Sequence, residues 1–362
     1  MTKILCTADN HLGYRQYGLQ VREQDIYDSF NNILKLAVEE KVDAITISGD
    51  LLHATRPSSR TIAFLKECHD YLIFREMPAI VVAGNHDKSE PHWITTLCDV
   101  SAWDGQSGGF VLLENEYLEV GDMVIHGAPF TNKRAWQKDK ELMRPDTDIL
   151  LMHQSFQEFI QFETEDAFSQ EDVEGLAKVV VVGDIHVTMK AASSEIYSPG
   201  SSELMSSTEE PQKYVLMIDN EHGQGDDMPL NSRFIEIPTR PIISETLDTN
   251  DCVAALFTQL REKAETAPLV FIKCNHKLVG VIERLRDLYD DTMIIRAKYY
   301  NPEVERAIAL HKDVSLEEVL DKFIKPDARN YELAKALLNP ECDVRFEIDS
   351  YVEKVLNQDA SE

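Results

Sequence analysis

The first 90 residues alternate between short apolar runs and longer amphipathic stretches. Three apolar runs have the length of strands: residues 4–7, 44–48 and 79–83. Between them, residues 25–41 place apolar side chains on one face at helical spacing, and a second helix is predicted from a serine cap near residue 58 to about residue 75. This β-α-β-α-β series predicts parallel strands with helices packed on their faces.

Further strand-length runs follow, and then the pattern changes. The later predicted strands are residues 117–120, 123–126, 149–153, 179–182, 214–218 and 234–237. Prolines at residues 238 and 241 predict a domain boundary. Beyond it we predict a helix, two strands and a mixed segment at residues 252–263, 269–273, 293–298 and 279–288, and then helices at residues 314–325, 331–338 and 344–356. The expected organisation is a main α/β domain over residues 1–240, a small α+β domain over 241–300 and helices over 301–362.

Composition places the chain among soluble, cytosolic proteins. Its 362 residues are 43% hydrophobic and 28% charged, which is enough apolar material for two domains. No apolar run approaches the ~20 residues of a membrane span, and the N-terminus lacks a signal-peptide pattern. The six cysteines form no C-x-x-C pair and are interpreted as reduced thiols. We therefore expect no membrane association and a cytoplasmic location.

The charge balance restricts the choice of partners. The chain has 36 Lys and Arg against 64 Asp and Glu, a formal net charge of −28. Nucleic-acid-binding proteins usually carry a basic surface, because neutralising phosphates supplies most of their non-specific affinity. A role on DNA would therefore need bound cations, local basic patches or a partner subunit.

Polar residues follow five of the predicted strands at the point where each strand ends. They are Asp9, Asn10 and His11; Asp50; Asn85, His86 and Asp87; His153; and Asp184 and His186. Any one of them alone is more simply a turn or helix-cap residue, and a lone histidine is more often an interior residue than a ligand. Together they predict a site at the carboxyl ends of the strands. Oxygen and nitrogen ligands without thiolate suit Mn²⁺, Fe²⁺ or Zn²⁺.

The spacing of these residues indicates hydrolytic chemistry. Asp9 and His11 lie two apart in an extended segment and can point to the same side. Asp50, alone in a Gly-Asp turn, is suited to bridge two metal ions, and paired ions stabilise the attacking and leaving oxygens in phosphoryl chemistry. His86, next to Asn85, is placed to protonate the leaving oxygen or to stabilise phosphate charge.

The motif order D-x-H, G-D, G-N-H-D, H and G-x-x-H resembles the calcineurin-like metallophosphoesterase superfamily. Within it, residues 9–14, Arg22 and residues 49–53 resemble the SbcD family, the nuclease subunits of SbcC–SbcD-type DNA repair and recombination complexes, including phage versions. Residues 150–154 and 197–201 add to the match. The resemblance covers residues 1–240 by motif and the rest by architecture. It implies a metallophosphoesterase β-sandwich with flanking helices, a small α+β capping domain and C-terminal helices that dock on an ATPase.

The resemblance also implies roles for single residues. One metal ion would be held by Asp9, His11, Asp50 and His186, and a second by Asp50, Asn85, His153 and the residue at position 184. His86 would act on the transition state, and His53 would be a second histidine that affects nuclease action. The family usually has histidine where this chain has Asp184, which adds a negative charge and leaves the metal preference open.

The resemblance further implies two divalent ions, Mn²⁺ above all, with DNA as substrate and an SMC-like ABC ATPase of SbcC type as partner of a homodimer within a heterotetramer. The sequence has no P-loop, so ATP use would come from that partner. Arg15 and Arg22 near the first motif are candidate DNA contacts. A basic cluster over residues 133–144, predicted as one helix, is either a DNA contact or a solvated helix face. An apolar stripe over residues 314–324 either packs on the chain's own core or binds the partner.

Three functions remain compatible with these motifs. The first is a metal-dependent DNA exonuclease or endonuclease. The second is a stand-alone phosphatase or cyclic-nucleotide phosphodiesterase with the same metal core, and the third is a non-catalytic scaffold. His53 and the long chain beyond the core favour the nuclease over the second, and the intact His86 argues against the third.

Overall fold

The chain forms two units, Met1–Pro241 and Ile242–Glu362, each with its own internal contacts. The computed structural model describes residues 1–89, 92–97, 108–160, 164–206, 209–220, 229–247, 249, 256, 268–289 and 294–300. Within these residues no helix combines the length and the apolar character that crossing a bilayer requires.

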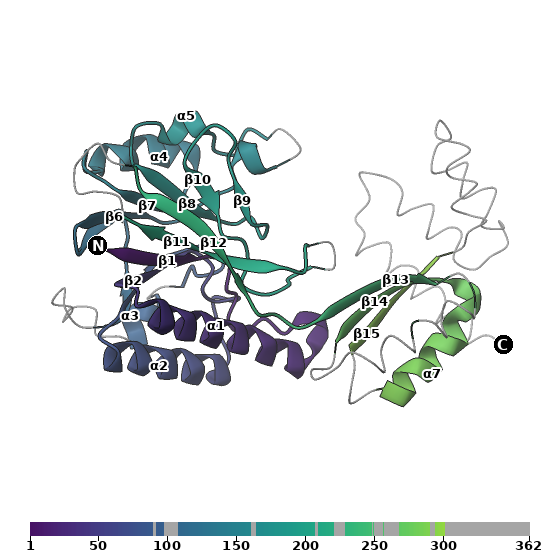
Figure 1. The fold of residues 1–362 in the computed structure, drawn as a ribbon. Coiled ribbons are helices and arrows are strands. Elements are labelled where there is room, and N and C mark those ends of the chain that lie inside the picture. Colours follow the sequence, from purple (N-terminus) through teal and green to yellow (C-terminus); the bar gives the residue numbers. More distant parts are fainter. Residues whose placement is uncertain are drawn as a thin grey trace, which may run out of the picture. The chain divides into compact units, whose positions relative to one another are not determined.

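The first unit contains two six-stranded sheets (Figure 1). The first sheet has the order β12 (Asn231–Ile237), β11 (Lys213–Asp219), β1 (Lys3–Thr7), β2 (Ala44–Ser48), β3 (Pro78–Val82) and β4 (Gly109–Leu112). The second has the order β5 (Glu116–Val120), β6 (Met123–Ala128), β7 (Ile149–His153), β8 (Val179–Gly183), β10 (Ile196–Ser198) and β9 (Met189–Lys190). Strands β1 to β4 pair in parallel, as do β6, β7 and β8, so their carboxyl ends lie on common edges.

Helices cover the outer faces of both sheets (Figure 1). They are α1 (Gln20–Glu40), α2 (Ser59–Phe74), α3 (Trp93–Leu97), α4 (Lys133–Asp139) and α5 (Gln170–Val173), with short 3₁₀ turns η1 (Gln16–Gly18), η3 (Lys140–Leu142) and η4 (Gln157–Phe159). Alternate residues of a strand face opposite sides of a sheet. In β1, Leu5 packs among the residues of α1 and α2, whereas Ile4 and Cys6 pack between the two sheets. A third cluster joins β7 and β8 to Trp136 of α4. The result is the sandwich with flanking helices that the family resemblance implies.

The second unit contains a three-stranded parallel sheet in its described part. The sheet has the order β13 (Ile242–Leu247), β14 (Leu269–Asn275) and β15 (Ile294–Tyr300), and η5 (His276–Leu278) leads into α7 (Val279–Tyr289). Residues 279–288, predicted as mixed, are therefore helical. The helix predicted at 252–263 falls almost wholly outside the described residues, as do all the helices predicted over residues 301–362, including the apolar stripe.

Two expectations about elements need correction. The predicted helix over 133–144 is shorter, because α4 ends at Asp139 and η3 follows it. The basic residues of that segment are also partly neutralised, since Lys133 lies 3.7 Å from Asp172 and Arg144 forms a 2.7 Å ion pair with Glu119. Strands β4 and β13 and the short strands β9 and β10 were not predicted from the sequence.

Candidate metal centre

Five loops at the strand ends of the sandwich bring the predicted ligands together. Asp9 and His11 follow β1, Asp50 follows β2, and Asn85 follows β3 in the first sheet. His153 ends β7 in the second sheet. The residues after β8, Asp184 and His186, complete the set. Residues from both sheets therefore meet at one edge of the sandwich.

Backbone hydrogen bonds hold the first two loops in register. The Asp9 amide donates to the Gly49 carbonyl over 3.2 Å, and the His11 amide donates to the Asp50 carbonyl over 2.9 Å. Asp9, His11 and Asp50 each have a positive φ, near 50°. Left-handed backbone is uncommon outside glycine and persists where the surrounding structure enforces it, often at functional sites.

Asp184 shares this conformation, with φ 78°. Its amide donates to Oδ1 of Asp9 over 3.0 Å, which couples the β8 loop to the β1 loop. Its Oδ1 lies 3.9 Å from Nε2 of His153, and its Oδ2 accepts a hydrogen bond from the Ser155 hydroxyl. Asp184 thus faces the same space as the other predicted ligands, although aspartate replaces the histidine that the resemblance leads one to expect.

One group of donor atoms surrounds the imidazole of His153, which has no exposed surface. Its Nε2 lies 3.0 Å from Oδ1 of Asn85 and 3.5 Å from Oδ1 of Asp50. Its Nδ1 is 2.9 Å from the carbonyl of Ser48, which can only accept, so Nδ1 carries the hydrogen. The lone pair of Nε2 is thereby free for a cation, as in most metal-binding histidines.

A second group lies around His11. Its Nε2 is 3.2 Å from Nε2 of His186 and 3.7 Å from Oδ2 of Asp50. Asp50 therefore contacts both groups through different oxygens. Within the described residues, Asp9, His11 and His186 form one set of donor atoms within 4.8 Å of one another, and Asp9, Asp50 and His153 form another.

The residues present fit a pair of divalent cations. Oδ2 of Asp9 is buried, and among the described residues it has no hydrogen-bond partner. A buried carboxylate oxygen without a donor is costly unless a cation satisfies it. The donors are carboxylate, imidazole and amide groups, which suit Mn²⁺, Fe²⁺ or Zn²⁺.

The electrostatics of the protein alone show how strongly these groups interact. Burial raises the pKa of Asp9 to about 6 and lowers the pKa of His11 to about 3. Burial also opposes the charged forms of His153 and Asp50, but their mutual hydrogen bond and attraction raise the pKa of His153 to about 10 and lower that of Asp50 to about 2. Without cations, the attraction of Asp50 and Asp9 therefore favours the protonated form of His153.

Two more histidines flank the groups of donor atoms. Nε2 of His86 lies 4.0 Å from Oδ2 of Asp50, and its Nδ1 donates to the His53 carbonyl over 2.7 Å. The His53 and His86 rings stack with centroids 5.3 Å apart. His53 also packs against Tyr14, at 4.3 Å between centroids. Both predicted catalytic histidines are therefore at the site, with Nε2 of His86 directed toward Asp50.

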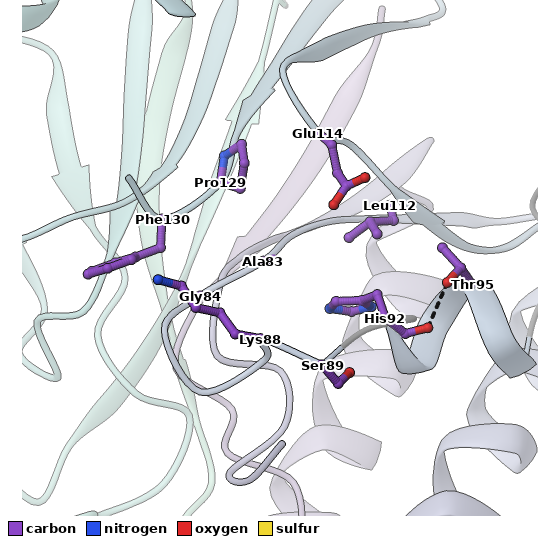
Figure 2. A pocket seen from close by; sticks show the side chains of 10 residues that line it. All are labelled: Ala83, Gly84, Lys88, Ser89, His92, Thr95, Leu112, Glu114, Pro129 and Phe130. Carbon is purple, nitrogen blue, oxygen red and sulfur yellow. Dashed lines mark hydrogen bonds between the residues drawn. The ribbon is translucent and has the colours of Figure 1, made fainter. Parts of the chain in front are cut away.

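Gly84 separates this centre from a neighbouring cavity. A Cβ on Gly84 would lie 2.1 Å from Oδ1 of Asp50, so only glycine allows the β3 loop to approach so closely. Asp87 fixes the same loop by accepting from the amides of Leu52 and Gly84. On the other side lies a cavity of about 770 Å³ that is also bordered by Phe130 (Figure 2).

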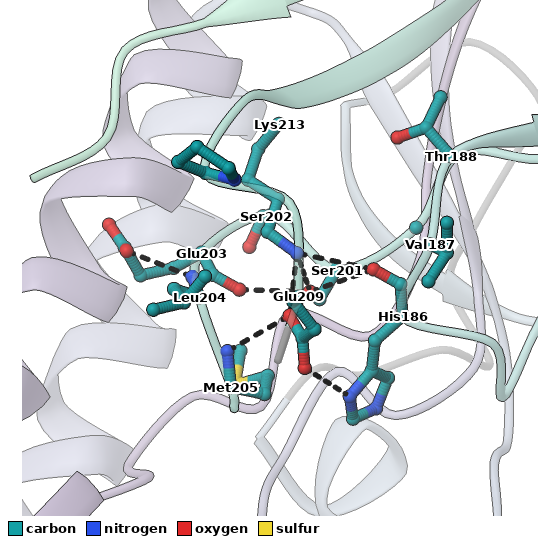
Figure 3. A network of polar contacts seen from close by, with 12 residues as sticks. His186, Val187, Thr188, Ser201, Ser202, Glu203, Leu204, Met205, Glu209 and Lys213 are labelled. Atoms are coloured by element: carbon teal, nitrogen blue, oxygen red, sulfur yellow. Dashed lines mark hydrogen bonds and ion pairs between the residues drawn. The ribbon is translucent and has the colours of Figure 1, made fainter. Parts of the chain in front are cut away.

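No local sequence pattern points to the carboxylate that orients His186. Nδ1 of His186 donates to Oε1 of Glu209 over 3.3 Å, and the other oxygen of Glu209 accepts from Lys213 over 2.6 Å and from the Met205 amide (Figure 3). Burial opposes the charge on Glu209, but the hydrogen bond from His186 and the charge of Lys213 lower its pKa. Glu209 follows no strand, and its partner is 23 residues away, so only the fold reveals the link.

The two predicted DNA-contacting arginines have different surroundings. Arg15 is exposed. Arg22 has no exposed surface and lies within 3.2 Å of Glu203 and 3.1 Å of the Leu204 carbonyl, with a 2.5 Å contact to Asp25. The expectation that Arg22 contacts DNA is therefore wrong, because its charge is buried and already paired.

Comparison with known proteins agrees with this geometry. The model of the calcineurin-like phosphoesterase family matches residues 2–188, which is 187 of the 362 residues. The chain belongs to the calcineurin-like phosphoesterases. The resemblance seen in the motifs is thus confirmed at the level of the family, and the sandwich holds the donor groups expected for a metal-dependent phosphoesterase.

Several curated relatives carry the name DNA double-strand break repair protein Mre11. The protein from Sulfurisphaera tokodaii is 29% identical over 73% of this chain and 70% of its own length. That from Archaeoglobus fulgidus is 26% identical over 95% of this chain and 83% of its own length. The alignment with the Methanosarcina mazei protein, also 29% identical, spans only 38% of that longer relative.

Proposed function

We propose that this calcineurin-like phosphoesterase is a Mn²⁺-dependent DNA nuclease. The observation that carries the proposal is the meeting of seven predicted ligands from five loops around Asp50, with Nε2 of His86 4.0 Å from that carboxylate. The names of the relatives support DNA as the substrate. The resemblance to the nuclease subunits implies that His53 is a second histidine affecting nuclease action. Its ring stacks on His86, which supports the nuclease over a stand-alone phosphatase.

The proposed reaction is hydrolysis of a phosphodiester by water. Bound cations would neutralise phosphate charge and lower the pKa of the attacking water. Asp9, His11, Asp50 and His186 would hold one ion, and Asp50, Asn85, His153 and Asp184 the other. Nδ1 of His86 donates to the His53 carbonyl, which orients the ring. With a second hydrogen on Nε2, in the imidazolium form, His86 would give a proton to the leaving oxygen or a hydrogen bond to the phosphate.

The proposal extends to the partners of the nuclease. We infer that the chain acts as a homodimer with an SMC-like ABC ATPase in DNA recombination, repair or end processing. A partner that contributes basic surface would offset the net charge of −28, which disfavours binding of DNA by this chain alone. Residues 301–362, in which we place the helices that dock on the ATPase, lie outside the described residues.

The test is to incubate the purified protein and Mn²⁺ with each of three substrates: linear duplex DNA, single-stranded circles and a chromogenic phosphomonoester. We expect cleavage of DNA. Turnover confined to the monoester would refute the nuclease, and no turnover with metal bound would favour a scaffold.

Two variants separate binding of the ions from chemistry. His86→Ala should retain the metal ions and lose at least ~10²-fold in rate, the lower end for general acid catalysis. Asp50→Ala should lose the metal ions as well. Unchanged cleavage by the first variant, or two ions retained by the second, would contradict the assigned roles.

A further inference from the structure

The cavity beside the metal centre is bordered by segments that carry no predicted metal ligand, apart from the loop after β3. The lining residues that bear on its chemistry are Gly84, Lys88, Ser89, His92, Glu114 and Phe130. Its volume of about 770 Å³ lies within the range of small-molecule sites. Because Gly84 lies against Asp50, a group in this cavity would be adjacent to a phosphate at the metal centre.

The end nearest the metal centre presents an aromatic face and a cation. The Phe130 ring centroid lies 6.2 Å from that of His153, and the Phe130 amide donates to the Ala83 carbonyl over 2.8 Å, which fixes the backbone beneath the ring. Nζ of Lys88 lies 4.2 Å from the Phe130 centroid (Figure 2). Lys88 is exposed and has no ion pair with a described carboxylate, so its flexible side chain can turn to a phosphate and uncover the ring.

The wall away from Phe130 contains polar atoms without partners. The Ser89 hydroxyl and Nε2 of His92 are both buried, and among the described residues neither has a hydrogen-bond partner. Nδ1 of His92 accepts from the Ile94 amide over 3.2 Å, so Nε2 carries a hydrogen and is a donor. The residue is only 8% exposed. Buried polar groups of this kind are rare unless a ligand or water satisfies them.

The charged residues that line the cavity favour a nucleobase over a phosphate inside it. Glu114 would repel a phosphate inside the cavity, whereas its carboxylate can accept from the amino group of a nucleobase. Among the described lining residues Lys88 is the one cation, and it lies at the Phe130 end, where the sugar-phosphate backbone would run toward the metal centre. An aromatic face combined with hydrogen-bonding groups suits a base, because every base has a flat π face.

We infer that this cavity receives the nucleoside adjacent to the scissile phosphate, with its base stacked on Phe130 and Lys88 on the neighbouring phosphate. The inference rests on the proposed nuclease function and adds a subsite that would make cleavage depend on an intact base. Phe130 is a specificity residue in this arrangement and takes no part in the chemistry.

The test compares two oligonucleotides that differ at one position. One carries a base on each side of the cleaved bond, and the other carries an abasic tetrahydrofuran residue on one side, placed in turn on either side. With Mn²⁺, the wild-type protein should cleave the intact strand about 10-fold faster than one of the abasic strands, a size expected for loss of one stacked base. Phe130→Leu should reduce this ratio to near 1, and Phe130→Tyr, which keeps the ring, should preserve it.

Phe74→Leu serves as the matched control, because Phe74 is 79% exposed on α2 and should leave both the ratio and the rate unchanged. Equal wild-type rates on all strands would overturn the subsite while leaving the nuclease intact. If Phe130→Leu keeps the wild-type ratio of intact-strand to abasic-strand cleavage, the subsite is likewise overturned, whatever the overall rate of the variant. If the wild-type protein cleaves no strand, the nuclease proposal fails and the subsite falls with it.

Discussion

Glu209 has the surroundings of a residue that positions a metal ligand. Its carboxylate accepts from Nδ1 of His186 and is itself held by Lys213. Such partners of metal-binding histidines fix the ring and its tautomer, and their loss typically lowers metal affinity or activity 10- to 100-fold.

We therefore predict that Glu209→Gln lowers the affinity for Mn²⁺ by about 10-fold or more while the protein stays folded. Titration calorimetry measures the affinity, and circular dichroism checks the fold. Glu210→Gln is the matched control, since Glu210 is the exposed neighbour of Glu209. An affinity within twofold of the wild type in both variants would show that His186 needs no orienting carboxylate.

Arg22 contributes to stability at the residue scale and not to recognition. Its guanidinium is fully buried between Asp25 of α1 and Glu203. Arg22→Met would leave Glu203 buried without its cation, and breaking a buried pair in this way typically destabilises a protein by about 3–5 kcal/mol.

Urea denaturation of the first unit should show this loss for Arg22→Met. Arg15→Met is the control, because Arg15 is exposed and a surface change of this kind should stay within about 0.5 kcal/mol. Full stability combined with weaker DNA binding in Arg22→Met would restore the original expectation that Arg22 contacts DNA.

At the scale of elements, strand β6 carries a buried histidine that links stability to pH. His126 is 1% exposed, and neither ring nitrogen has a hydrogen-bond partner among the described residues. Burial lowers its pKa below the ordinary value near 6.5. The unfolded chain therefore takes up the proton first, so this contribution to stability is complete above pH 6.5 and is lost as the pH falls below it.

We expect His126→Phe to remove this dependence. Between pH 7.5 and 5.5 the wild-type protein should lose more unfolding free energy than the variant, because its unfolded chain takes up a proton at residue 126 more readily than the folded protein does. Denaturation curves at both pH values measure the difference. Parallel losses in the two proteins would mean that His126 is protonated as easily in the fold as in the unfolded chain.

The strands that carry the site could be predicted from the sequence, because short local patterns identify them. Each ligand loop follows an apolar run whose length and hydrophobicity identify a strand, and β7 has the predicted bounds Ile149–His153. Helix α1 begins at Gln20, five residues before the predicted start at residue 25. The prediction missed its first turn because that turn is mostly polar and does not show the apolar pattern of the rest. Arg22, in that turn, is buried by partners more than 180 residues away, which no local pattern reveals. Glu209 was missed for the same reason.

At the scale of the whole molecule, the net negative charge of the chain and the candidate metal centre depend on each other. Seven predicted ligands include three carboxylates, Asp9, Asp50 and Asp184, and His153 lies within 3.9 Å of an oxygen of each. Two divalent cations would add four positive charges at this point. We therefore expect the ions to be needed for two things. They would hold the ligand loops together, and they would attract a phosphate to a chain of net charge −28.

The most direct measurement is a crystal structure of the protein grown with Mn²⁺ and recorded at the manganese absorption edge. We expect two anomalous peaks about 3.5–4 Å apart, the usual separation in two-metal sites. Oδ1 and Oδ2 of Asp50 should lie between them, with His11 and His186 on one ion and Asn85 and His153 on the other. A single peak under saturating Mn²⁺, or two peaks that do not share Asp50, would contradict the account.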